Sequence, residues 1–126
     1  MEADLLLPEE EKDIPCKKTI LYVLTGAKCW TCEYIDSLED KDKSKLLALL
    51  NRIVDNGPPR NKEKFRLLED GIFEIKSYQD RLLCFYDKNK RNSLIITHGV
   101  KKQAQKLRRE EIEKAKDFRK AYYQEG

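Results

Sequence analysis

The chain has 126 residues, of which 40% are hydrophobic and 39% are charged, and its net charge of +3 is too small to indicate nucleic-acid binding by itself. This length suits one domain with one core. No apolar run approaches the roughly 20 residues that a membrane-spanning helix needs, and no signal peptide is visible. These features predict a cytoplasmic protein without a membrane partner.

Residues 1–18 are predicted to form a flexible N-terminal extension, and residues 19–126 a single domain. Pro8 and Pro15 interrupt the extension, and residues 1–13 carry an acidic excess. We hypothesise from this charge alone that the extension can bind a basic surface of its own domain.

The first half of the domain predicts one strand and two helices. Residues 19–24 are apolar and β-branched, which is typical of a strand. Residues 28–38 have apolar side chains at helical spacing, and from about residue 42 a wide leucine-rich stripe predicts a second helix. The sequence Asn-Gly-Pro-Pro at 56–59 indicates where that helix ends.

Residues 71–102 predict an antiparallel meander of three strands. Residues 72–77 alternate between apolar and polar, as in a half-buried strand. Residues 81–86 are almost continuously apolar, as in a strand covered on both faces. Residues 93–97 form a third strand that ends at His98 and Gly99.

A last helix is predicted from about Arg108, with apolar residues on one face and acidic residues in its first turn. The order of elements is then β-α-α-β-β-β-α. We therefore predict an α+β domain in which helices pack on one face of a small antiparallel sheet.

Three segments resemble the RelE/ParE toxin superfamily of type II toxin–antitoxin systems, and in particular its HigB-like, phage-derived branch. They are DSLEDKDKSKLLALLNRIVDNG (36–57), LEDGIFEIKSYQDRLLCFYD (68–87), and ITHGVKKQAQK followed by EIEKA (96–115). The resemblance covers about residues 19–123. It implies a RelE-like fold and a toxin that cleaves messenger RNA on the ribosome. It also implies silencing by a cognate antitoxin, expected to be of the helix-turn-helix type.

Metal-independent RNA cleavage uses the 2′-hydroxyl as the nucleophile on the adjacent phosphate, with no cofactor. It needs groups that accept and donate protons, and cations that oppose the charge of the transition state. With a single histidine in the chain, Lys, Arg and Tyr must share this work. The candidates for catalysis are Arg81, Lys76, His98 and Lys102. The candidates for nucleic-acid contact are Lys101, Lys106, Arg108 and Tyr122.

Each candidate also has a structural interpretation. Arg81 could extend from a strand edge, His98 could bond the backbone of its own turn, and Lys101 and Lys102 could be a solvated run. Tyr122 and Tyr123 could simply pack the end of the last helix.

Two other functions stay open. The pair Cys29 and Cys32 at a predicted helix start resembles a thioredoxin-like redox site, and with Cys16 and Cys84 it could bind zinc. The predicted element order lacks the β/α crossovers of a thioredoxin fold, so we rank redox or zinc binding lower and expect no metal. A ParE-like toxin that inhibits DNA gyrase without cleaving RNA is the other alternative.

Overall fold

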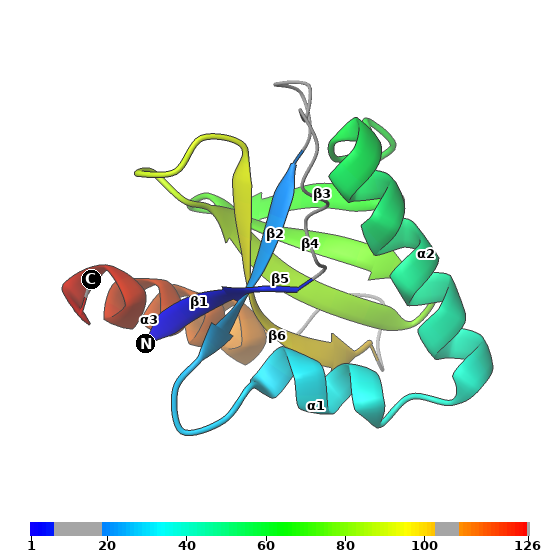
Figure 1. Cartoon of the computed structure of the whole chain (residues 1–126), viewed down its shortest axis with the longest axis horizontal. Helices are drawn as coiled ribbons and strands as arrows, with labels where there is room; N and C mark the ends of the chain where they lie inside the picture. Colours follow the sequence, from blue (N-terminus) through cyan, green and yellow to red (C-terminus); the bar gives the residue numbers. More distant parts are fainter. Residues whose placement is uncertain (7–18, 103–108, 126) are drawn as a thin grey trace.

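The computed structural model describes residues 1–6, 19–102 and 109–125, which form a six-stranded sheet with three helices (Figure 1). The strands are β1 (Glu2–Leu5), β2 (Ile20–Thr25), β3 (Phe65–Glu69), β4 (Ile72–Ser77), β5 (Asp80–Tyr86) and β6 (Ser93–Lys101). The helices are α1 (Trp30–Asp36), α2 (Asp40–Asn56) and α3 (Arg109–Glu125). This arrangement confirms the α+β class.

The predicted meander is confirmed in β4, β5 and β6, which pair antiparallel in chain order. Strand β6 does not end at His98 but continues to Lys101. A β-bulge lies between the pairs Leu83–His98 and Cys84–Ile96, so that Thr97 is the extra residue. The bulge lets both long strands keep their apolar side chains on the correct faces.

The prediction of a purely antiparallel sheet is wrong at β2, which pairs parallel with β6. The spatial order of the strands is β1-β2-β6-β5-β4-β3. Hydrophobic patterns show that a segment is a strand, but they do not show which neighbour it pairs with or in which direction. The parallel pair joins the start of the domain to its last strand.

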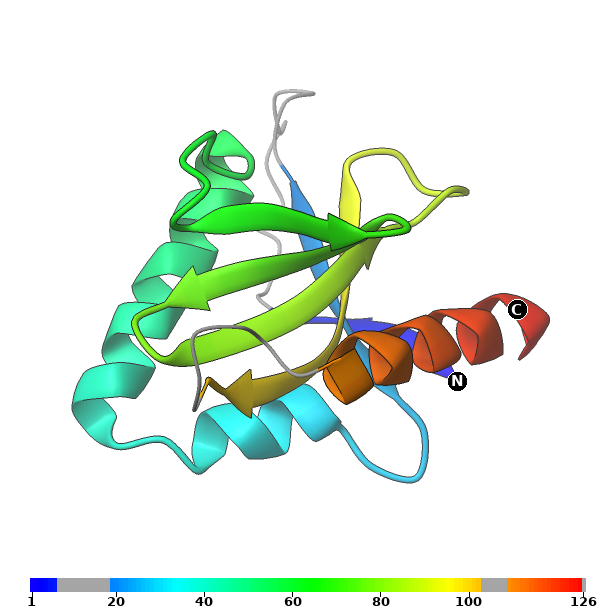
Figure 2. The same cartoon turned by 180° about the vertical axis from the view of Figure 1, so that it is seen from behind.

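The prediction that all helices pack on one face is also wrong. Helices α1 and α2 pack on one face of the sheet, whereas α3 packs on the opposite face (Figures 1 and 2). Because β5 and β6 carry buried apolar side chains on both faces, each face of the sheet must be covered by a helix. Arg109 and Lys116 of α3 form ion pairs with Glu69, which tie the helix to the β3–β4 hairpin.

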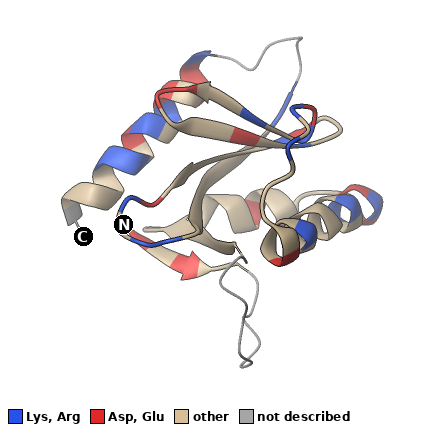
Figure 3. Ribbon diagram, turned by 90° about the horizontal axis from the view of Figure 1, so that it is seen from above, with Lys and Arg blue, Asp and Glu red and all other residues tan. Residues whose placement is uncertain are grey.

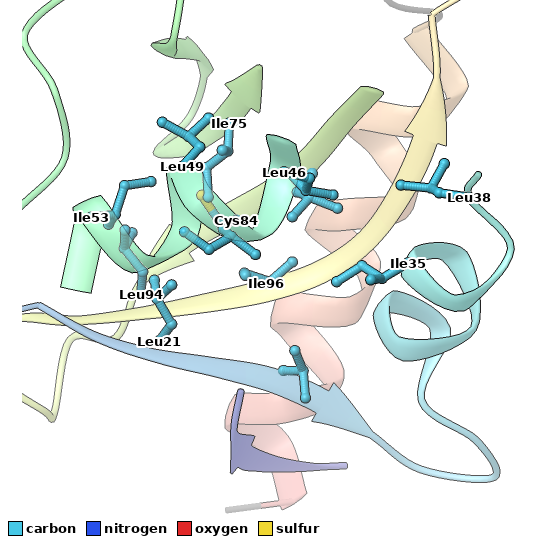
Figure 4. Close-up of a cluster of buried hydrophobic side chains, with 13 residues drawn as sticks. Leu21, Ile35, Leu38, Leu46, Leu49, Ile53, Ile75, Cys84, Leu94 and Ile96 are labelled. Carbon is cyan, nitrogen blue, oxygen red and sulfur yellow. The ribbon is translucent and has the colours of Figure 1, made fainter. Parts of the chain in front are cut away.

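Each face has its own apolar cluster. The cluster under α1 and α2 is centred on fully buried side chains such as Leu46 and Ile75 (Figure 4). The cluster under α3 contains Phe85 and Ala115. Charged residues gather instead on the helices and at strand ends (Figure 3). The leucine-rich stripe of α2 is therefore core, as its spacing predicts.

Helix α2 ends where the sequence predicts. Gly57 adopts a left-handed backbone conformation with φ of 82°, and its N–H donates to the carbonyl of Ile53 over 2.8 Å. A residue with a Cβ adopts such a conformation at a cost, whereas glycine does not. The prolines that follow prevent the helix from continuing.

Two strands were not predicted as such. Residues 65–69 form β3, which extends the meander by one antiparallel strand. In the segment predicted to be a flexible extension, Glu2–Leu5 forms β1, which pairs with β2 at the opposite edge of the sheet from β3. Residues 7–18 lie outside the described part of the chain.

Candidate functional site

The antiparallel meander brings three chain segments to one end of the sheet. Strand β4 ends there at Ser77, β5 begins there at Asp80, and β6 ends there at Lys101. Figure 3 shows blue segments gathered at this end of the strands. Lys76, Arg81, Lys101 and Lys102 therefore share one end of the domain, as the sequence indicates.

A buried ion pair lies at the centre of this end. The Arg81 Nε atom is 3.1 Å from Glu74 Oε1, and both side chains are almost fully buried. Glu74 Oε2 also accepts a hydrogen bond from Arg66 over 3.2 Å. One carboxylate thus has two guanidinium groups beside it, so the surroundings of Glu74 carry a net positive charge.

The prediction that the Arg81 guanidinium lies exposed at the sheet edge is wrong, because the residue is only 5% exposed. Its Nη1 group donates to the backbone carbonyls of Tyr78 and Asp80, which lie in and after the β4–β5 turn. Strand β5 is covered on both faces from its first residue, so Arg81 has no open edge to reach. The side chain holds the turn in shape.

Lys76 is more accessible than Arg81, its partner across the hairpin. It lies directly opposite Arg81 in the β4–β5 register and is half-buried, which confirms the predicted cross-strand neighbourhood. Burial lowers the pKa of Lys76, the Glu74 carboxylate opposes that shift, and the charges of Arg66, Arg81 and Lys102 lower the pKa further. Lys102 therefore lies within electrostatic reach of Lys76. We name Arg66, Lys76, Arg81 and Lys102 the cationic cluster.

Lys101 does not join this cluster. Its Nζ atom lies 3.3 Å from the buried carboxylate of Asp80, which also accepts a hydrogen bond from the hydroxyl of Tyr34 in α1. Alternation along β5 places Asp80 with Leu82 and Cys84 on the α1 and α2 face, while Arg81 faces the other side. Burial and the Asp80 carboxylate raise the pKa of Tyr34. Lys101 and Lys102 thus lie on different faces of the sheet.

His98 is buried under α3, with 2% of its surface exposed. Its Nε2 atom lies 3.0 Å from Glu111 Oε1, and its Nδ1 atom lies 2.9 Å from the Thr97 hydroxyl. Burial lowers the pKa of His98, although the bond to Glu111 opposes this. We infer a neutral ring whose Nε2–H donates to Glu111. The Thr97 hydroxyl lies within hydrogen-bond distance of both Nδ1 and the Leu83 carbonyl, and its single proton can be donated to only one of them at a time. His98 holds α3 against β6 and does not face an open surface.

Tyr122 lies at the opposite end of the sheet. Its ring packs 5.9 Å from that of Phe85, and its hydroxyl donates to Asp87 Oδ2 over 2.6 Å. Phe85 follows Arg81 by four residues along β5, a distance of about 13 Å at the usual rise of a strand. Burial and Asp87 raise the pKa of Tyr122. Tyr122 therefore packs the α3 face and is remote from the cationic cluster.

Lys106 and Arg108 lie outside the described residues. They belong to the segment that joins β6 to α3.

Cys29 and Cys32 form a disulfide at the start of α1, where Cys29 Sγ also accepts a hydrogen bond from the Cys32 N–H. Cys84 is a free thiol buried in β5 on the cluster under α2. In residues 1–6, 19–102 and 109–125 no group of side chains could hold a metal ion. Within the same ranges, none of the helices has the length and apolar character to cross a bilayer.

The cationic cluster can bind a phosphate diester and oppose negative charge on it. The cations that can face a phosphate come from Arg66, Lys76 and Lys102. The buried pair of Glu74 and Arg81 holds the backbone in place and contributes to the electrostatic potential at Lys76. An ammonium group whose pKa is lowered is also a stronger acid than an ordinary lysine. Lys76 is thus equipped to give a proton to a leaving oxygen.

Sequence reasoning missed Glu74 and Arg66 as parts of this group. The alternation of residues 72–77 predicts an exposed polar face, yet Glu74 is 1% exposed. An acidic residue between two cations in adjacent strands was the available signal, but it becomes visible only once the register Arg66–Glu74 is known.

A comparison with protein families gives one match. Residues 33–120, which are 88 of the 126 residues, match the family model described as "Phage derived protein Gp49-like (DUF891)". The matched range includes α2, the meander and most of α3. No curated protein matches the chain.

Proposed function

Because the chain belongs to the Gp49-like family of phage-derived, toxin-like proteins, we propose that it is the toxin of a type II toxin–antitoxin system. We further propose that it is a HigB-like endoribonuclease that cleaves ribosome-bound messenger RNA in the cytoplasm without a metal ion. A cognate antitoxin of the helix-turn-helix type neutralises it in this proposal.

The observation that carries the nuclease proposal is the cationic cluster at the end of the meander. It unites residues from β3, β4, β5 and the end of β6 around one buried carboxylate. Phosphate diesters in RNA gain negative charge as the 2′-oxygen attacks, and fixed cations stabilise that charge. The described cations therefore suit the electrostatic part of this reaction.

Lys76 has the central role in the proposed mechanism. Its ammonium group contacts the scissile phosphate and protonates the departing 5′-oxygen, while Lys102 stays beside the non-bridging oxygens. The reaction breaks the bond between phosphorus and the 5′-oxygen and forms a 2′,3′-cyclic phosphate. The ribosome completes the site by accepting the 2′-hydroxyl proton in this proposal. The buried side chains of Arg81 and Glu74 hold Lys76 in position and contact no substrate.

The experiment is induced expression in a bacterial host, with growth and the integrity of total messenger RNA followed together. The natural protein should arrest growth and fragment message, and Lys76→Ala should do neither. Lys90→Ala is the matched control, because it removes an exposed lysine from the β5–β6 turn at the other end of the meander. Growth arrest with intact message would reject the nuclease and favour a gyrase-directed toxin.

A further inference from the structure

Tyr78 is an exposed aromatic residue beside the cationic cluster. It lies in the turn between β4 and β5, and 65% of its surface is exposed. Its backbone is left-handed, with φ of 57°. Asp70 and Asn92, the other described non-glycine residues with positive φ, are of types that tolerate this conformation, whereas a tyrosine adopts it with difficulty. Backbone strain at a residue whose large ring is exposed indicates that the ring has a function.

The ring has cations around it. Lys45 Nζ of α2 lies 4.2 Å from the ring centroid, and Lys64 Nζ, just before β3, lies 5.6 Å from it. Lysines at such distances are attracted to the negative face of the ring. The exposed ring thus has two ammonium groups within 5.6 Å of its centroid, and they come from separate parts of the chain.

The backbone of the turn that carries this ring is held beside the cluster. The Tyr78 carbonyl accepts a hydrogen bond from Arg81 Nη1. The neighbouring Gln79 carbonyl accepts one from the Lys102 N–H over 2.7 Å. Lys76 lies two residues earlier in the same hairpin. The backbone of the turn is therefore fixed relative to Arg81 and Lys102, while the ring itself lies against Lys45 of α2.

We propose that Tyr78 is a stacking platform for one base of single-stranded RNA, with Lys45 and Lys64 on the phosphates of that strand. This inference rests on the proposed nuclease function and names how its substrate is held. An aromatic face between cations is the usual way in which proteins hold unpaired bases without strong sequence preference. Tyr78 thus holds a base of the same strand whose scissile phosphate Lys76 contacts.

The test uses a short single-stranded RNA that contains 2-aminopurine, whose fluorescence is quenched when it stacks on an aromatic ring. The full chain and Tyr78→Phe should bind this RNA with similar affinity and similar quenching. Tyr78→Asn keeps a residue that tolerates positive φ, and it should lose the quenching and roughly 5- to 150-fold in affinity. Tyr86→Asn is the matched control, because Tyr86 is an exposed tyrosine at the other end of β5.

Equal affinity and quenching in Tyr78→Asn would overturn the inference, as would the absence of saturable RNA binding by the natural chain.

Cleavage of ribosome-bound message by the same preparations separates the two proposals. If the natural chain cleaves message and Tyr78→Asn does so with unchanged KM, this inference fails and the nuclease proposal stands. If the natural chain cleaves nothing, the proposed function fails. If Tyr78→Asn keeps its RNA affinity but escapes an antitoxin, the ring belongs to a protein interface instead.

Discussion

The Arg81–Glu74 pair shows how burial changes the role of a single residue. A strand that begins with arginine and continues with apolar residues suggests an exposed guanidinium. Instead, Arg81 compensates a carboxylate that is itself 1% exposed. Removing one partner of such a pair leaves an uncompensated buried charge, which is costly. Loss of activity in an Arg81 variant would therefore not identify a catalytic residue.

Arg81→Met should lower the free energy of unfolding by about 3 kcal/mol or more, because Glu74 then lacks its buried partner. The double variant Arg81→Met with Glu74→Gln should recover much of that loss, since no unpaired charge remains. Urea denaturation of both variants measures this. Unfolding of Arg81→Met at the same urea concentration as the natural chain would show that the pair stabilises nothing.

Variants of Lys76 distinguish the role of its positive charge from its role as a proton donor. Lys76→Arg should keep RNA affinity within a few-fold but lower the cleavage rate on the order of a hundredfold, because a guanidinium does not release its proton near neutral pH. Lys76→Ala should lose both affinity and rate. Binding and single-turnover cleavage, measured side by side, check this. A Lys76→Arg variant that cleaves normally would make Lys76 a pure phosphate contact.

The pH dependence of cleavage follows from the same residue. Because the pKa of Lys76 is lowered from 10.5, its ammonium form is lost at a lower pH than that of an ordinary lysine. An acid must be protonated to act, so the cleavage rate should fall as the pH rises through this lowered pKa. In the natural chain the midpoint of this alkaline decline should lie below pH 10.5.

At the scale of elements, His98 joins β6 to α3. The pKa of His98 in the folded chain lies below its usual 6.5. Above about pH 6.5 the ring is neutral in both the folded and unfolded states, and the full stability is present. As the pH falls below that value the unfolded chain takes up the proton more readily, so stability is lost until the folded chain also titrates.

His98→Gln should therefore show a smaller loss of stability between pH 7.5 and pH 5.5 than the natural chain. Glutamine cannot take up that proton, yet it can still donate to Glu111. Urea midpoints at the two pH values give the comparison, and carboxylates that titrate in both proteins cancel. An identical loss in both proteins would place the pH sensitivity elsewhere.

Gly99 controls how α1 packs on the sheet. A Cβ at this position would lie 2.6 Å from Cγ of Tyr34 and 3.0 Å from Leu82 Cδ2. Gly99→Ala should thus displace Tyr34 and lower the free energy of unfolding by about 1–3 kcal/mol. Gly26→Ala is the control, because its Cβ would meet only ordinary contacts at 3.5 Å. Equal stability of the two variants, measured by thermal melts, would refute this packing.

The elements were predictable to different degrees. The stripe from Leu46 to Ile53 and the stop at Gly57 predict α2 closely, because helical periodicity and glycine conformation are local properties. The pairing of β2 with β6 is not local, and its direction was missed. The extra strand β3 is not predictable from its sequence, because this short and largely exposed segment has little apolar pattern.

At the scale of the whole molecule, β5 has apolar side chains on both faces, so both faces of the sheet must be covered by helices. Residues 81–86 show this two-sided pattern in the sequence, but the pattern does not say which helix covers which face. Once α3 lies on the second face, His98 becomes buried and Tyr122 moves to the far end. Two of the eight predicted site residues, His98 and Tyr122, therefore depended on where this helix packs.

What remains of the predicted site is its centre. Lys76 and Lys102 lie together with Arg81 beneath them, as expected for strands that meet at one end of a meander. Glu74 and Tyr78 were missed, because their importance arises from burial and from backbone conformation. Neither quantity can be read from residue type alone.

The most direct measurement is the chemical nature of RNA ends after the purified protein acts on ribosome-bound message. Attack by the 2′-hydroxyl predicts 5′-hydroxyl products and 2′,3′-cyclic phosphates. Their yield should fall on the order of a hundredfold with Lys76→Ala and stay unchanged with Lys90→Ala. Products with 5′-phosphate and 3′-hydroxyl ends, or intact message under conditions where the protein still arrests growth, would contradict the account.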